Sequence, residues 1–251
     1  MIDKIFNEDC LEGMKRIPDG SVDFVLTDLP YGITVCEWDK KIDLTKFWEQ
    51  ANRVTKRNGA MAMFSQLPFG VDLINANRKN FRYEWIWEKS LGTGMFNAKK
   101  MPLRCHENIL VFYQKLPTYN PQFRSGKPYK RAPQTPKNYE GGVYHGVKSL
   151  PSRNDGDKYY PRDVIKFTVS MSSEERYHNT QKPVDLLEYL IKTYTNEGEL
   201  VLDATIGSGS TAVACINTNR HFIGFELNEK YFDIANQRIA EAQARKAQEL
   251  F

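Results

Sequence analysis

Apolar and polar residues are arranged over the first 113 positions in an order that predicts strands separated by helices. Short, mostly apolar runs with the length of buried strands occupy residues 22–28, 59–64, 83–87 and 108–113. Apolar residues at helical spacing occupy residues 44–54 and 69–77. This alternation is typical of an α/β fold with a mostly parallel sheet covered by helices.

A second block with the same character closes the chain. Strands are predicted at 200–203 and 221–226, and helices at 184–194, 210–218 and 229–250. The last helix carries Phe232, Ala235, Ile239 and Ala242 on one face, which predicts that it packs on the sheet. Neither block has enough strands for a stable open sheet, so we expect the two blocks to share one sheet.

Composition places the chain among globular proteins, with 251 residues of which 41% are hydrophobic and 26% charged. No run of about 18 apolar residues occurs, and the first residues lack the pattern of a secretion signal. The four cysteines are far apart in the sequence, with no C-x-x-C pair. These features predict a cytoplasmic protein with reduced thiols and without a clustered metal site.

Charge is distributed unevenly around a basic middle. Residues 89–182 contain 17 Lys and Arg against 7 Asp and Glu, although the net charge of the whole chain is only +4. Aromatic residues alternate with these basic ones, at Tyr113, Tyr119, Phe123, Tyr129, Tyr139, Tyr144, Tyr159 and Tyr160. The stretch is either a solvated loop or a surface that meets phosphates with its cations and bases with its rings.

A ligand loop is predicted where the strand at 200–203 ends. Asp203 closes the strand, and Gly207 and Gly209 precede a helix whose first N–H groups are free. Glu226 ends the next strand, where a carboxylate can bind two ribose hydroxyls. The alternatives are a plain glycine turn and a dinucleotide site of an oxidoreductase, because Gly207-x-Gly209-x-x-Ala212 matches that fingerprint. A P-loop is excluded, since no Gly-Lys-Ser/Thr follows.

A second motif follows the strand at 22–28. Asp28, Leu29, Pro30 and Tyr31 stand at a strand's carboxyl end, where α/β sheets place their ligands. The alternative interpretation is a simple turn at the strand exit. The tetrapeptide Asp-x-Pro-Tyr is moderately specific alone, and much more so beside a nucleoside-binding loop.

These motifs resemble those of the S-adenosylmethionine-dependent DNA amino-methyltransferases, in the subgroup whose catalytic tetrapeptide precedes the cofactor loop. Residues 28–31 resemble the Asp-Pro-Pro-Tyr element, and residues 202–211 resemble the cofactor loop. Residues 179–183 are similar to the element before that loop, and residues 7–10 to the segment that closes over the adenine of the cofactor. Leu29 departs from the family, in which proline is commonest at this position.

The resemblance implies a Rossmann-like methyltransferase sheet with helices on both faces and a circularly permuted order of motifs. It divides the chain into a catalytic half (1–95), a basic target-recognition insert that includes a sheet strand near 108–114 (96–177), and a cofactor-binding half (178–251). Its partners would be double-stranded DNA, a second copy in a homodimer, and a separate restriction endonuclease, unless the enzyme is solitary or carried by a phage.

The resemblance also implies roles for individual residues. Asp28 and a carbonyl at Leu29 or Pro30 would bind the amine of a flipped base, and Tyr31 would stack on it. Glu226 would hold the ribose of S-adenosylmethionine, Gly207 and Gly209 its methionine portion, and Asp203 its amino group or the loop itself. The remaining cofactor candidates are Asp9, Cys10, Gln181, Lys182 and Thr205.

The expected reaction needs no metal, and an acidic first residue is more typical of adenine-N6 than of cytosine-N4 enzymes. Cytosine-N4 methylation is therefore the first alternative. RNA or protein amide methylation, a NAD-dependent oxidoreductase and a non-catalytic nucleic-acid-binding protein are the others. The complete Asp-x-Pro-Tyr element argues against the last two.

Overall fold

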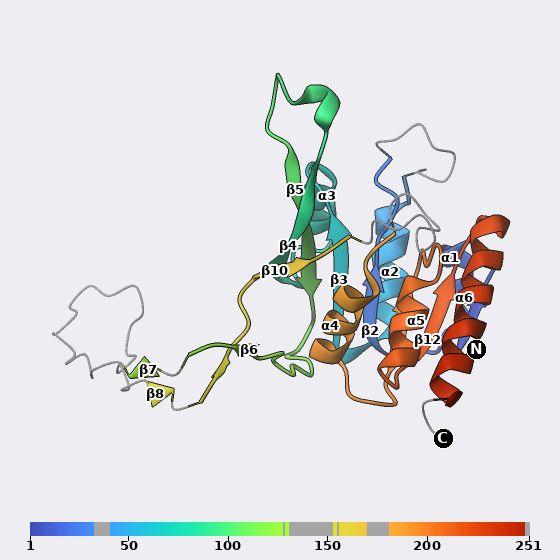
Figure 1. Ribbon diagram of the computed structural model, residues 1–251. Helices are drawn as coiled ribbons and strands as arrows, with labels where there is room; N and C mark the ends of the chain where they lie inside the picture. Colours follow the sequence, from blue (N-terminus) through green and yellow to red (C-terminus); the bar gives the residue numbers. More distant parts are fainter. Residues whose placement is uncertain (33–40, 128, 131–152, 155, 170–180, 249–251) are drawn as a thin grey trace. The chain divides into compact units, whose positions relative to one another are not determined.

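The computed structural model describes residues 1–32, 41–127, 129–130, 153–154, 156–169 and 181–248 (Figure 1). The chain forms two compact units, one made of Met1–Asn120 with Asp163–Phe251 and the other of Pro121–Arg162. In the smaller unit, β6 (Arg124–Ser125) pairs with β9 (Lys158–Tyr159), and β7 (Tyr129–Lys130) pairs with β8 (Arg153–Asn154). The larger unit contains the predicted α/β elements.

The larger unit is built on an eight-stranded sheet with the order β1-β12-β11-β2-β3-β5-β4-β10. Its strands are β1 (Lys4–Phe6), β2 (Val22–Thr27), β3 (Thr55–Ser65), β4 (Phe81–Thr93), β5 (Arg104–Phe112), β10 (Val164–Phe167), β11 (Leu200–Asp203) and β12 (His221–Phe225). Only β5 runs antiparallel to its neighbours. The parallel pairing of β11 with β2 joins the two sequence blocks, which confirms the single shared sheet.

Helices cover both faces of the sheet (Figure 1). One face carries α1 (Cys10–Met14), α2 (Leu44–Val54) and α3 (Phe69–Ala76), and the other α4 (Val184–Tyr194), α5 (Ser210–Asn217) and α6 (Glu229–Gln248). Successive residues of β2 serve the two layers, because Val25 packs under the first set of helices and Phe24 and Leu26 under the second. None of the described helices combines the length and apolar sequence needed to cross a membrane.

The structure differs from the sequence prediction mainly in short elements. The chain pattern missed β1, α1 and β10, which have 3, 5 and 4 residues and are too short to show a period. Strand β10 lies parallel to β4, and the Trp87 indole N–H donates to the Phe167 carbonyl at 3.0 Å. The separate unit, 121–162, lies inside the predicted insert of 96–177, and the sheet strand that this prediction included near 108–114 is β5. Strand β10, which was not predicted, also belongs to the main sheet.

Candidate active site

The two predicted motifs meet at one edge of the sheet. Strands β2 and β11 are parallel neighbours, so the segments that follow Thr27 and Asp203 emerge side by side. They open into a cavity of about 840 Å³. Its lining includes the predicted residues Asp9, Cys10, Asp28, Leu29, Pro30, Tyr31, Gln181, Lys182, Asp203, Thr205, Gly207 and Glu226.

Asp203 orders the loop that follows β11. Its Oδ1 accepts the Thr205 backbone N–H at 3.1 Å, and its Oδ2 accepts the Thr211 hydroxyl at 2.6 Å. Burial raises the pKa of Asp203 to about 6, although the hydrogen bonds from Thr211 and Thr205 act in the opposite direction. Of the two roles expected for Asp203, the geometry supports the ordering of the loop.

Glu226 is held at the end of β12 by two backbone donors. The Gly207 N–H reaches its Oε2 at 2.9 Å, and the Asn228 N–H reaches its Oε1 at 2.7 Å. Burial raises the pKa of this carboxyl, and the bonds from Asn228 and Gly207 oppose the shift. Each carboxylate oxygen has further lone pairs, so the group can also accept hydrogen bonds from a ligand in the cavity.

The two loop glycines have different surroundings. Both have left-handed backbones, with φ of +55° at Gly207 and +83° at Gly209. A Cβ added at Gly207 would meet nothing within 4 Å, whereas one added at Gly209 would lie 3.0 Å from the Ala235 Cβ on α6. Gly207 thus lines the cavity, and Gly209 allows the loop to pack on α6.

The tetrapeptide carries its polar groups toward the same cavity. The Tyr31 hydroxyl donates to Asp28 Oδ1 at 2.7 Å, and the Lys182 ammonium bonds Asp28 Oδ2. The Thr205 hydroxyl donates to the Asp28 carbonyl at 3.0 Å, which ties the two motifs together. Leu29 is buried beneath the layer of helices that contains α1 and α2, which indicates a packing role at this position.

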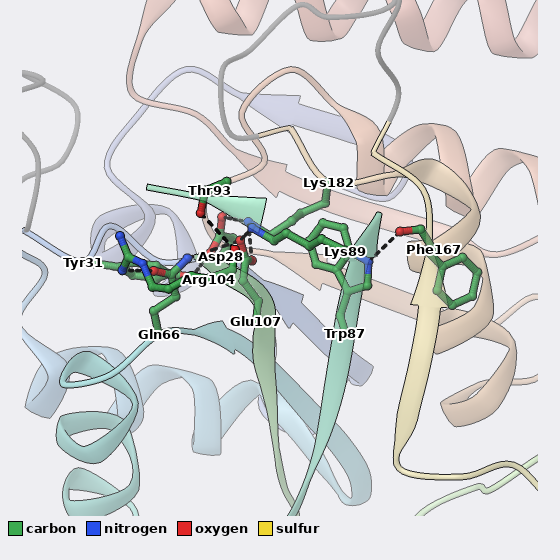
Figure 2. Close-up of polar contacts among 10 residues, drawn as sticks. All are labelled: Asp28, Tyr31, Gln66, Trp87, Lys89, Thr93, Arg104, Glu107, Phe167 and Lys182. Atoms are coloured by element: carbon green, nitrogen blue, oxygen red, sulfur yellow. Dashed lines mark hydrogen bonds and ion pairs between the residues drawn. The ribbon is translucent and has the colours of Figure 1, made fainter. Parts of the chain in front are cut away.

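Four polar residues near Asp28 were not predicted from the sequence (Figure 2). Glu107 on β5 is buried and bonds the Lys89 ammonium from β4, and Lys182 lies 3.4 Å from its other oxygen. Gln66 lies 3.4 Å from Glu107 and accepts a bond from Arg104 at 2.9 Å. Burial would raise the pKa of Glu107, but Lys182 and Lys89 outweigh it, and the pKa is lowered. The sequence signal was weak, since Glu107 and Lys89 flank predicted strands whose pairing was unknown.

A protein-family model that matches most of the chain assigns the protein to a family. The model of the DNA methylase family, which unites enzymes that methylate amino groups at N6 or N4, matches residues 22–237. The chain belongs to this family. The DNA methylases use S-adenosylmethionine, and the Rossmann-like α/β sheet described above is the fold of their class.

Individual DNA methylases are similar over nearly the whole chain. The Type II methyltransferase M.BglII of Bacillus subtilis is 32% identical, over 95% of this chain and 69% of its own length. The DNA adenine methyltransferase YhdJ of Escherichia coli K12 is 26% identical, over 98% of this chain and 85% of its own. The crystal structure of an M1.HpyAVI–SAM complex has a TM-score of 0.64 at 25% identity, and covers 94% of this chain and 98% of that one.

The cavity of this DNA methylase fits S-adenosylmethionine. Its volume lies within the range of roughly 300–1,000 Å³ usual for small-molecule sites. Gly207 has no side chain, which leaves room for the cofactor to approach the backbone closely, and the carboxylate oxygens of Glu226 can accept hydrogen bonds from the ribose hydroxyls. Gly207 and Glu226 are therefore residues that would hold the nucleoside part of the cofactor.

Proposed function

We propose that this DNA methylase transfers a methyl group from S-adenosylmethionine to the N6 amino group of adenine, at specific sites in duplex DNA. The observation that carries the proposal is the single cavity shared by the Asp28 carboxylate and the Gly207–Glu226 pair. A cofactor bound at one end would face a base bound at the other. The cavity therefore has room for the two reactants next to each other.

The residues around Asp28 would align and activate the amine. S-adenosylmethionine supplies a methyl group that is already electrophilic, so the reaction depends mainly on alignment. Asp28 would accept one N6–H hydrogen bond and the carbonyl of Leu29 or Pro30 the other, which raises electron density on nitrogen. As the nitrogen–carbon bond forms and the carbon–sulfur bond breaks, the surplus proton on nitrogen would pass to Asp28 and then to water.

Tyr31 would change partners when the base enters. Its hydroxyl occupies Asp28 Oδ1, and its ring packs on Phe69 with 4.9 Å between centroids. An adenine bound to Asp28 would displace the hydroxyl, and the freed ring would stack on the base. Because Asp28 and Tyr31 line this cavity, the base would have to leave the double helix to reach them.

The cofactor end would be formed by residues from four segments. Glu226 would accept the ribose hydroxyls, and Gly207, Asp203 and Thr205 would line the amino-acid portion. Gln181 lies at the same loop, 3.3 Å from the Ser208 hydroxyl. Asp9 and Cys10 would form the wall next to the adenine of the cofactor.

DNA contact would come from the basic middle of the chain, including the β4–β5 hairpin. Residues 89–106 hold four Lys and Arg and no Asp or Glu. The hairpin tip, which contains the short helix η1 (Met95–Asn97), reaches beyond the neighbouring strands (Figure 1). Phe96 is fully exposed there, beside Lys99 and Lys100. Cations and an exposed ring suit phosphates and unstacked bases.

Adenine is proposed as the target because Asp28 is the acidic form of the tetrapeptide and YhdJ is a DNA adenine methyltransferase. Cytosine-N4 methylation is the alternative within the same family. Both bases present an exocyclic amine, so the same carboxylate geometry serves either. The methylated nucleoside distinguishes them.

Asp28→Ala tests the mechanism. We expect the variant to lose methyl transfer to DNA while its cofactor dissociation constant, measured by calorimetry, stays within about threefold of the wild-type value, because Asp28 faces the base. Asp233→Ala, on the exposed side of α6, is the matched control and should keep full activity. Near-normal turnover by Asp28→Ala would refute the mechanism.

A further inference from the structure

Asp28 belongs to a buried cluster of four charged side chains (Figure 2). The others are Lys182, Glu107 and Lys89, and their side chains are only 10%, 8% and 12% exposed. They come from four places: the end of β2, the segment before α4, and strands β5 and β4. Two carboxylates and two ammonium groups give the cluster a formal charge of zero.

Lys182 is the central member of this cluster. Its ammonium bonds Asp28 Oδ2, lies 3.4 Å from Glu107 Oε2, and stands 5.0 Å from the centre of the Phe64 ring. Glu107 is fixed in turn by Lys89, which bonds its other oxygen. The contact with Lys182 uses one oxygen of Asp28, and Tyr31 occupies the other. Both contacts therefore fix the rotation of the Asp28 carboxylate, and Lys182 provides the one that would remain when a base displaces the Tyr31 hydroxyl.

The cluster also favours ionised groups in a place where burial opposes them. Burial alone would lower the pKa of Lys182, yet Asp28 and Glu107 more than compensate and the pKa is raised. The pKa of Glu107 is lowered by the two lysines in the same way, against the effect of burial. Lys182 and Glu107 thus support each other's charged forms.

We propose that Lys182, held in place by Glu107, is a positioning residue that keeps the Asp28 carboxylate turned so that Oδ1 faces the amine of the target base. The inference rests on the proposed function. It assigns Lys182 to the base side of the cavity, whereas the sequence placed it among the cofactor ligands. Glu107 acquires a role through Lys182, since it balances the second positive charge.

The role differs from simple structural support in what it does to Asp28. In addition to Lys182, the groups in the described part of the chain that face this carboxylate are Tyr31 and the buried Asp203, whose charge acts on the same site. Removal of the ammonium would leave the Oδ2 atom of Asp28 without the cation that fixes it. The carboxylate could then turn away from the base.

Lys182→Met tests the proposal, because methionine keeps an unbranched apolar stem and removes the charge. We expect kcat for DNA methylation to fall about 100-fold, as for the loss of one preorganised polar group. The cofactor dissociation constant should stay within about threefold of the wild-type value, so the loss appears in kcat and not in cofactor binding. Lys182→Arg should restore part of kcat. Lys192→Met, on the exposed side of α4, should match the wild type.

Glu107→Gln provides a second route if Lys182→Met unfolds, since glutamine preserves the shape of the side chain. We expect kcat to fall about tenfold, with the melting temperature and the cofactor affinity close to those of the wild type. Weakened cofactor binding with unchanged kcat in Lys182→Met would return Lys182 to the cofactor and overturn the proposal. An unchanged kcat in both variants would also overturn it. Failure of the wild-type protein to methylate DNA would instead refute the proposed function.

Discussion

The two glycines of the cofactor loop should respond differently to the same substitution. Both have positive φ, so alanine at either position pays about 1–2 kcal/mol for a left-handed backbone. At Gly209 the new methyl would also lie 3.0 Å from the Ala235 Cβ and 3.1 Å from its Cα. Because the Ala235 Cα belongs to the backbone of α6, it cannot move aside as a flexible side chain can, and the overpacking should lower the free energy of unfolding by about 1–3 kcal/mol more. Gly209→Ala should therefore be the more destabilising change.

Gly207→Ala should mainly affect ligand binding. Its methyl would project into the cavity, where no protein atom lies within 4 Å. A cofactor that approaches the Gly207 backbone closely would have to shift. A loss of about 1.4 kcal/mol in binding free energy corresponds to a tenfold weaker complex. We expect the dissociation constant of S-adenosylmethionine to rise at least about tenfold in this variant.

Urea unfolding and calorimetry on the two variants separate these effects. The free energy of unfolding should be lower in Gly209→Ala than in Gly207→Ala by about 1–3 kcal/mol, which corresponds to roughly 2–10 °C in melting temperature. Equal destabilisation of the two variants would show that the contact with α6 adds nothing to the cost of alanine at Gly209. Unchanged cofactor affinity in Gly207→Ala would contradict the location assigned to the cofactor.

Two further predictions concern charge and DNA contact. The pKa of Asp203 is about 6 in the folded protein, against an ordinary value of 3.8, so the folded state binds this proton more tightly than the unfolded state does. The free energy of unfolding should therefore increase by up to about 3 kcal/mol as the pH falls from 8 to 4. Urea titrations of Asp203→Asn should lack this increase. Phe96→Ala should weaken duplex DNA binding, measured by fluorescence anisotropy, without lowering the melting temperature, and Lys99→Ala should reduce by about one the slope of log binding constant against log salt concentration. Leu116→Ala, also at an exposed position, is the control. Equal DNA affinities of the Phe96 and Leu116 variants would exclude the hairpin tip from the DNA interface.

The sequence predicted the cavity because its motifs follow strands that the fold makes neighbours. Asp28 and Asp203 each close a mostly apolar run, and parallel strands bring such ends to one edge of the sheet. Glu226 follows the same rule on β12. The convergence of these carboxylates could therefore be predicted without knowledge of any side-chain contact.

Other features depend on tertiary pairing and had no local signal. Glu107 faces Asp28 only because β5 runs antiparallel between β3 and β4, a reversal that apolar periodicity does not encode. The short strand Lys4–Phe6 forms because β12 offers it a parallel edge. Gly209 was expected to contact the cofactor, and its packing on α6 became visible only once that helix was placed. These are the cases in which long-range contacts, rather than local sequence, determine the structure.

The most direct test of the central claim is the transfer of tritiated methyl groups from S-adenosylmethionine to unmethylated duplex DNA, followed by digestion and chromatography of the nucleosides. The account predicts label on N6-methyladenine with the wild-type protein and none with Asp28→Ala. Label on N4-methylcytosine would contradict the choice of base while keeping the site. Absence of label from DNA, with the cofactor bound, would contradict the proposed reaction itself.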